Sequence, residues 1–220
     1  MRALVLLIAL TSAPALGQHS PITISLTAGG ATNATLASGS ALYNPQVGFV
    51  NESYQQSAGP LVSLAARYRL SRYLGAGVLL GYSRSTITHR YSAFRHLFPD
   101  EASADFEAAQ YDGFATVRIE RPGKVTPFGE ARIGVGLLSQ DSHSLYVGAQ
   151  QHHSDTSIHP AAHFLLGVRM ALTPRVSLES GVGSRWDFHG TSTFACDRTA
   201  CTNDLNSQRW SFQAGVQFNL

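Results

Sequence analysis

The sequence predicts an all-β fold, an eight-stranded antiparallel up-and-down transmembrane β-barrel. Three observations favour this fold: eight segments alternate apolar and polar residues with a period of two, long and short connections alternate between them, and aromatic residues fall at two levels of the apolar face. Beyond the N-terminal region, no apolar run approaches the roughly 20 residues of a transmembrane helix, so a membrane-spanning chain has to cross with strands.

Residues 1–17 predict a cleaved secretory signal peptide. Arg2 gives a positive start, residues 3–10 are apolar, and Ala15-Leu16-Gly17 places small residues around a cleavage site before Gln18. The remaining chain, residues 18–220, has the length expected of a single barrel domain. A formal net charge of +2 argues against nucleic acid as a partner.

The clearest strand is the segment 125–138. Its apolar face carries Ala131, Ile133, Val135 and Leu137, and its polar face carries Glu130, Arg132, Gly134 and Gly136. A soluble sandwich buries the apolar face, whereas a membrane barrel turns that face to lipid and the polar face to its lumen. We expect Gly134 and Gly136 to leave room inside for larger side chains.

The same alternation occurs in seven further segments: 22–28, 60–70, 73–85, 111–121, 161–172, 176–188 and 209–220. Short turns at 71–72, 121–124 and 173–175 carry proline, glycine and basic residues. Longer polar stretches lie between the other segments, at 29–59, 90–110, 140–160 and 190–208. This alternation predicts four long external loops and three short periplasmic turns, with both termini at the periplasmic end.

Aromatic residues of the apolar face fall at two heights. Five of them lie near the long-loop end and two near the short-turn end: Tyr82, Tyr111, Phe164, Trp186 and Trp210, then Tyr68 and Phe218. Two aromatic girdles of this kind are typical of membrane barrels. A soluble, lipocalin-like barrel is the alternative fold.

With these features, the chain resembles the small eight-stranded outer-membrane β-barrel family, of the OmpA transmembrane domain, OmpX and OmpW kind. The resemblance covers essentially the whole mature chain and includes the alternating terminal strand 210–220, although its last aromatic is Phe218 and its last residue is Leu220. It implies the outer membrane of a Gram-negative bacterium, with outer-membrane lipids and lipopolysaccharide as partners. It also implies recognition of the C-terminal strand by the barrel assembly machinery.

The polar face of the strands collects charges of both signs. They are Arg67, Arg69, Arg118, Glu120, Glu130, Arg132, Arg169, Glu179, Arg185 and Asp187. Side chains fill the interior of an eight-stranded barrel, and buried charges persist only when they are paired. We therefore expect a salt-bridge network that plugs the lumen, with Arg118, Glu120 and Arg169 as partners of Glu130 and Arg132. A narrow conduit or an acid–base pair is the alternative.

The long loops contain two further groups of candidate site residues. Cys196 and Cys201 lie five positions apart in the fourth long loop and predict a local disulfide in an exported chain. Five histidines gather around the third long loop, with Asp141 and Asp155 nearby: His143, His152, His153, His159 and His163. Their spacing matches no zinc or copper ligand frame, so we interpret them as solvated loop residues and expect neither metal nor cofactor.

The second long loop contains an acidic stretch, residues 99–110. It predicts a solvated loop face with a short helix that begins at Asp100. With the first and fourth loops, it provides material for contact with an external surface ligand.

The favoured function is a structural or surface-interaction role, in adhesion or recognition. A small channel or transporter for hydrophobic or small solutes is the first alternative. A lipid-modifying enzyme is the second: His89, His163 and His189 lie near the outer rim, with Ser83, Ser85, Ser184 and Asp187 at similar height. No sequence signature joins these residues, so we expect no enzymatic activity.

Overall fold

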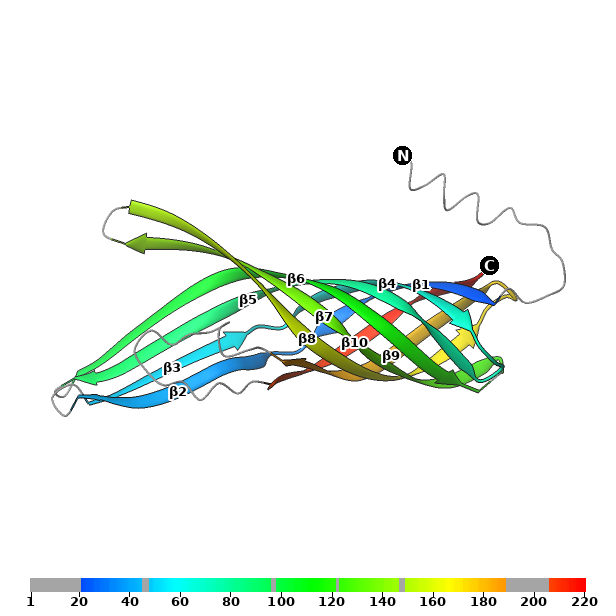
Figure 1. Ribbon diagram of the computed structural model, residues 1–220, viewed down its shortest axis with the longest axis horizontal. Coiled ribbons are helices and arrows are strands. Elements are labelled where there is room, and N and C mark those ends of the chain that lie inside the picture. The colour runs from blue at the N-terminus through cyan, green and yellow to red at the C-terminus, as the bar shows by residue number, and fades with distance from the viewer. Residues whose placement is uncertain (1–20, 45–47, 96–97, 122, 147–148, 189–205) are drawn as a thin grey trace.

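The computed structural model of the protein describes residues 21–44, 48–95, 98–121, 123–146, 149–188 and 206–220 (Figure 1). They form ten strands: β1 (Ile22–Ala31), β2 (Ala34–Asn44), β3 (Gly48–Gln56), β4 (Gly59–Arg69), β5 (Leu74–Arg95), β6 (Phe98–Glu120), β7 (Val125–Tyr146), β8 (Ala149–Ala171), β9 (Val176–Phe188) and β10 (Asn206–Asn219). Within these ranges, no helix has the length and apolar character needed to span a membrane.

Eight of the strands close into a barrel. The sheet order runs β5-β4-β1-β10-β9-β8-β7-β6, and β6 pairs back with β5. The first and last strands meet in antiparallel register, with Ile24 opposite Phe218. Each of the other neighbours is also antiparallel. The eight-stranded antiparallel up-and-down barrel predicted from the sequence is confirmed.

Strands continue into three of the stretches expected to be loops. Residues 29–59 contain the hairpin β2–β3, while β5 and β6 stay paired as far as Arg95 and Phe98, and β7 and β8 as far as Tyr146 and Ala149. The helix expected at Asp100 is wrong, because Asp100 lies in β6 opposite Ala93. Strand pairing begun in the barrel continues to satisfy the backbone hydrogen bonds of these residues, and a helix would have to break it.

Above the barrel, the sheet divides into two parts (Figure 1). The hairpin β2–β3 joins the sheet through β3, whose residues Val50–Gln56 pair with Ala93–Ile87 of β5. The pairing of β6 with β7 ends at Glu107 and Asp141. Beyond that pair, the hairpin β7–β8 projects away from β5 and β6 (Figure 1). The described part of the long-hairpin end is therefore built mainly from strands.

The two faces of the barrel wall carry opposite kinds of residue. On β7, Ile133 is 73% exposed on the outer face, while Glu130 is fully buried inside. The girdle aromatics lie on the outer face. The rings of Tyr82 and Tyr111, on the neighbouring strands β5 and β6, have their centroids 5.2 Å apart. So large an apolar outer surface around a polar interior fits lipid outside the barrel. It does not fit a soluble sandwich or a lipocalin-like barrel.

Candidate functional site

The centre of the lumen is organised around Glu130 of β7, which is 0% exposed. Its Oε2 atom lies 2.8 Å from Nη2 of Arg67 and 3.6 Å from Nη1 of Arg118. Its Oε1 atom accepts a hydrogen bond of 2.7 Å from Nε of Arg132. Because β4 and β7 are three strands apart in the ring, the Arg67–Glu130 pair bridges the lumen.

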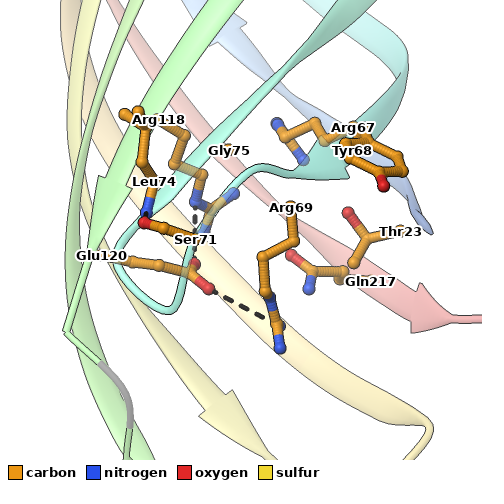
Figure 2. A pocket seen from close by; sticks show the side chains of 10 residues that line it. All are labelled: Thr23, Arg67, Tyr68, Arg69, Ser71, Leu74, Gly75, Arg118, Glu120 and Gln217. Carbon is orange, nitrogen blue, oxygen red and sulfur yellow. Dashed lines mark hydrogen bonds and ion pairs between the residues drawn. The ribbon is translucent and has the colours of Figure 1, made fainter. Parts of the chain in front are cut away.

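A second cluster lies at the end of the short turns. Nη1 of Arg118 donates to Oε2 of Glu179 at 2.7 Å, again between strands three apart in the ring. Glu120 lies 3.3 Å from Nε of Arg118, 3.0 Å from Nη1 of Arg169 and 3.9 Å from Nη2 of Arg69. Figure 2 shows this mouth of the barrel, where Arg69 and Arg118 approach Glu120 from different strands. The cluster narrows that end of the lumen around a small pocket that Arg69, Arg118 and Glu120 line.

A third cluster lies toward the long hairpins. Nη2 of Arg185 donates to Oδ1 of Asp112 at 2.8 Å and to Oδ1 of Asp187 at 2.6 Å. Arg209 donates from Nη2 to Oδ2 of Asp187 at 3.2 Å and to Oε1 of Gln110 at 2.6 Å. Gln110 and Arg209 stand on β6 and β10, four strands apart in a ring of eight, so this contact crosses the lumen directly.

Aromatic rings cover two of the lumen arginines. The guanidinium carbon of Arg118 lies 3.5 Å from the ring centroid of Phe128, and that of Arg185 lies 5.5 Å from the ring centroid of Phe114. Both rings point inward and are buried. These stacking contacts fill space that the ion pairs leave and hold the guanidinium planes in place.

His163 connects the central cluster to β10. Its Nδ1 atom lies 3.1 Å from Nη1 of Arg132, and its Nε2 atom lies 3.0 Å from Oγ of Ser211. A guanidinium only donates hydrogen bonds, so Nδ1 accepts and Nε2 carries the proton, which it donates to Ser211. In this arrangement His163 does not take a proton from the Ser211 hydroxyl.

An apolar layer lies above the polar lumen. It consists of Leu36, Ile87, Ala108 and Leu138, each at most 2% exposed, with Tyr54 and Phe106 packed against it. The four buried residues come from β2, β5, β6 and β7. The described side chains therefore occupy the lumen at three polar levels, with an apolar cluster above them. A small cavity remains between the central and upper polar levels, beside Asp112, Arg132 and His163.

All ten charged residues predicted for the lumen lie on the inner face. Eight of them are buried, whereas Arg69 and Glu120 remain partly exposed at the mouth. Of the three partners expected for Glu130 and Arg132, Arg118 pairs with Glu130, while Glu120 and Arg169 instead pair with each other. Arg67, which reaches Glu130 from across the lumen, was not expected as its partner.

No family model and no curated protein sequence matches the chain. The outer membrane protease OmpT from Escherichia coli is similar over 96% of this chain and 100% of its own, with 8% identity and a TM-score of 0.50. Neisserial surface protein A is similar over 91% of this chain and 98% of its own, with 21% identity and a TM-score of 0.47. OprG from Pseudomonas aeruginosa is similar over 94% of this chain and 99% of its own, with 11% identity and a TM-score of 0.44.

The chain has the fold of the small outer-membrane β-barrels. At these identities the likeness extends to the fold alone.

His159 and His163 are buried at 1% and 5% exposure, so their interpretation as solvated loop residues is wrong. Three further charged or amide side chains of the lumen, Asp112, Arg209 and Gln110, were not predicted as lumen residues. Asp112 and Arg209 have the inward parity of their segments and could have been found from it, although they stand near the segment ends. Gln110 and His159 lie in stretches interpreted as loops, and both are buried against Asp187. Their signal was absent because the strands extend further than the alternation does.

Some of the remaining candidate residues lie outside the part of the chain that the structure describes. Cys196, Cys201 and His189 lie outside the described residues, so the disulfide stays a prediction. The backbones of His143 and His152 face each other near the tip of β7–β8, and the side chains of His143, His152 and His153 lie outside the description. Among the residues that are described, no group of three or more histidine, cysteine, aspartate or glutamate side chains could hold a metal ion.

Proposed function

We propose that the protein is a structural and surface-interaction barrel of the Gram-negative outer membrane, with a plugged lumen and long hairpins that present an adhesive or recognition surface. Export through residues 1–17 and recognition of β10 by the barrel assembly machinery are parts of this proposal. Outer-membrane lipids and lipopolysaccharide are its expected surroundings.

The observation that carries the proposal is the set of contacts across the lumen. Pairs such as Arg67–Glu130, Arg118–Glu179 and Arg209–Gln110 join strands that are three or four apart in the ring of eight. A conducting path would have to break these buried pairs, and leaving a buried charge unpaired is costly. The lumen therefore favours a mechanical role over transport.

The hairpins support the surface-interaction part of the proposal. Strands β5 to β8 have 22 or 23 residues each. A barrel strand tilted by about 45° crosses the bilayer core with only about 9–11 residues, so about half of each strand extends beyond the core. Above the girdle their outer face becomes polar, with the pairs Arg84–Glu107 and Thr88–Asp105 exposed. Stiff hairpins of this kind hold a contact surface away from the membrane.

Two truncations test the surface role. Residues 141–154 of β7–β8 are replaced by an Asn-Gly turn, which leaves the β6–β7 pairs up to Ala108–Gln140 intact. In the matched variant, the same turn replaces residues 94–99 of β5–β6, which preserves the pairing of β3 with β5. Adhesion to an epithelial monolayer is measured for non-adherent Gram-negative cells that express each protein.

We expect the full chain to raise adhesion over cells without it, and at least one truncation to return it to background. Heat-modifiable migration in gels checks that each barrel remains folded. Planar-bilayer recordings of the refolded full chain should show no stable conductance. Adhesion at background for the full chain, together with stable conductance and solute flux into liposomes, would contradict the proposal and favour a channel.

A further inference from the structure

The short turns carry four exposed basic residues at one end of the barrel. They are Arg72, Arg121, Lys124 and Arg175, which we call the short-turn rim. The described aspartate and glutamate side chains at this end are Glu120 and Glu179, and both engage arginines inside the lumen. The outward surface of the described rim is therefore positively charged, without carboxylate side chains to neutralise it.

Two of the turns are built in the same way. In the first, the hydroxyl of Ser71 accepts hydrogen bonds from the backbone amides of Tyr73 and Leu74, at 3.2 and 3.1 Å. In the other, the hydroxyl of Thr173 accepts from the amides of Arg175 and Val176, at 3.2 and 3.0 Å. These bonds fix the turn backbones without using the side chains of Arg72 or Arg175.

Backbone hydrogen bonds also tie each turn to the neighbouring strand. The carbonyl of Tyr73 accepts from the amide of Glu120 at 2.9 Å, and that of Lys124 accepts from Ala171 at 2.9 Å. The carbonyl of Arg175 accepts from Asn219 at 2.8 Å. The rim is thus held around the barrel, and its cations start from fixed positions.

The rim lies at the depth of lipid headgroups. Each cation is within three residues of a lipid-facing side chain: Tyr73, Ile119, Val125 and Leu172 are all between 47% and 63% exposed. At about 3.4 Å per residue, this places the cations within about 10 Å of the hydrocarbon. The guanidinium of Arg72 lies 4.7 Å from the ring centroid of Tyr73, which anchors it beside the apolar belt.

We propose that the short-turn rim binds anionic glycerophospholipids in the leaflet at this end of the barrel. Their phosphodiester carries the charge that the rim lacks, and guanidinium groups bind phosphate oxygens in pairs. Their acyl chains lie against the apolar residues directly above the turns. The short-turn rim thus selects its neighbouring lipids by charge.

Native mass spectrometry of the refolded full chain tests this selection. The protein is released from mixed micelles that contain phosphatidylglycerol and phosphatidylcholine with matched acyl chains, and the retained lipids are counted. The test variant is R72Q/R175Q, which leaves the turn hydrogen bonds in place. The matched control is R84Q/R90Q, which removes two exposed cations from the opposite end.

The full chain should retain phosphatidylglycerol in preference to phosphatidylcholine. Each rim cation removed should lower that preference by up to about fivefold, since a basic residue near an anionic lipid surface contributes about 1 kcal/mol. R84Q/R90Q should leave most of the preference intact, and added salt should weaken it in the full chain. Heat-modifiable migration checks that both variants are folded.

Three results would overturn the proposal. The first is equal retention of the two lipids by the full chain. The second is an equal loss of preference in R84Q/R90Q and R72Q/R175Q, which would place the selection away from the rim. The third is displacement of phosphatidylglycerol by soluble glycerophosphate at the same concentration, which would show an anion site that does not need the lipid.

Discussion

Two levels of this barrel follow opposite burial rules. Within the membrane, the charged Glu130 is fully buried and the apolar Ile133 on the same strand is 73% exposed. Above the membrane, the apolar Leu36 and Ile87 are buried, and the charged pair Arg84–Glu107 is exposed. The surrounding medium therefore determines which residues face outward at each level: apolar residues face lipid, and charged residues face water.

The change between the two levels occurs over a few residues. On the outer face of β5, the girdle residue Tyr82 is followed two positions later by Arg84. On the inner face, polar Ser83 is followed four positions later by buried Ile87. Tyr82 and its partner Tyr111 therefore mark the boundary, which is where amphipathic rings concentrate at a membrane interface.

The largest effect is expected from the substitution Glu130→Ala at the membrane level. It leaves Arg67, Arg118 and Arg132 buried around a missing carboxylate. Removing one partner of a buried ion pair costs about 3–5 kcal/mol. The free energy of unfolding, measured by urea titration of vesicle-refolded protein, should fall by that amount.

The exposed pair above the membrane gives the control for this substitution. Glu107→Ala removes the partner of Arg84 where water can solvate the remaining charge. Its unfolding midpoint should stay close to that of the unmodified chain. If Glu130→Ala left the midpoint equally unchanged, the lumen network would not stabilise the barrel.

The two levels also differ in how well the sequence predicts them. Strict alternation from Glu130 to Leu137 revealed the strand and both of its faces, because lipid lies on one side and a charged lumen on the other. In β2, small and polar residues occupy both faces, so Leu36 stands out neither as strand nor as core. Contacts across the lumen, such as Arg67 with Glu130, depend on strand register and barrel closure, which parity alone does not give.

A smaller effect is expected from Ile87→Ala in the apolar layer. Ile87 packs against Leu36, Ala108 and Leu138 with 0% exposure, so its truncation leaves a cavity that costs about 2–4 kcal/mol. The cost should fall on the extension, because the barrel below is held by its own ion pairs. Hydrogen exchange should therefore speed up in the β3–β5 pairing while the barrel amides remain protected.

Ile133→Ala serves as the counterpart on the lipid face. Ile133 is directed outward, so its truncation leaves no internal cavity and should not change exchange in β3. Equal acceleration of exchange in both variants would show that the extension and the barrel open together. The boundary at Tyr82 and Tyr111 would then have no energetic meaning.

The smallest effect concerns two glycines on neighbouring strands. A Cβ added to Gly134 would collide with the backbone of Gly113, whereas one added to Gly113 would meet nothing within 4 Å. Gly134 therefore permits a close approach of two backbones, while Gly136, as expected from the sequence, leaves room for His159 and Gln110. Gly134→Ala should cost about 1–3 kcal/mol through overpacking, and Gly113→Ala should cost much less. Urea titration of both variants measures the difference. Equal midpoints would mean that β6 can move away from β7 without cost, and the membrane level would then be less rigid than its ion pairs suggest.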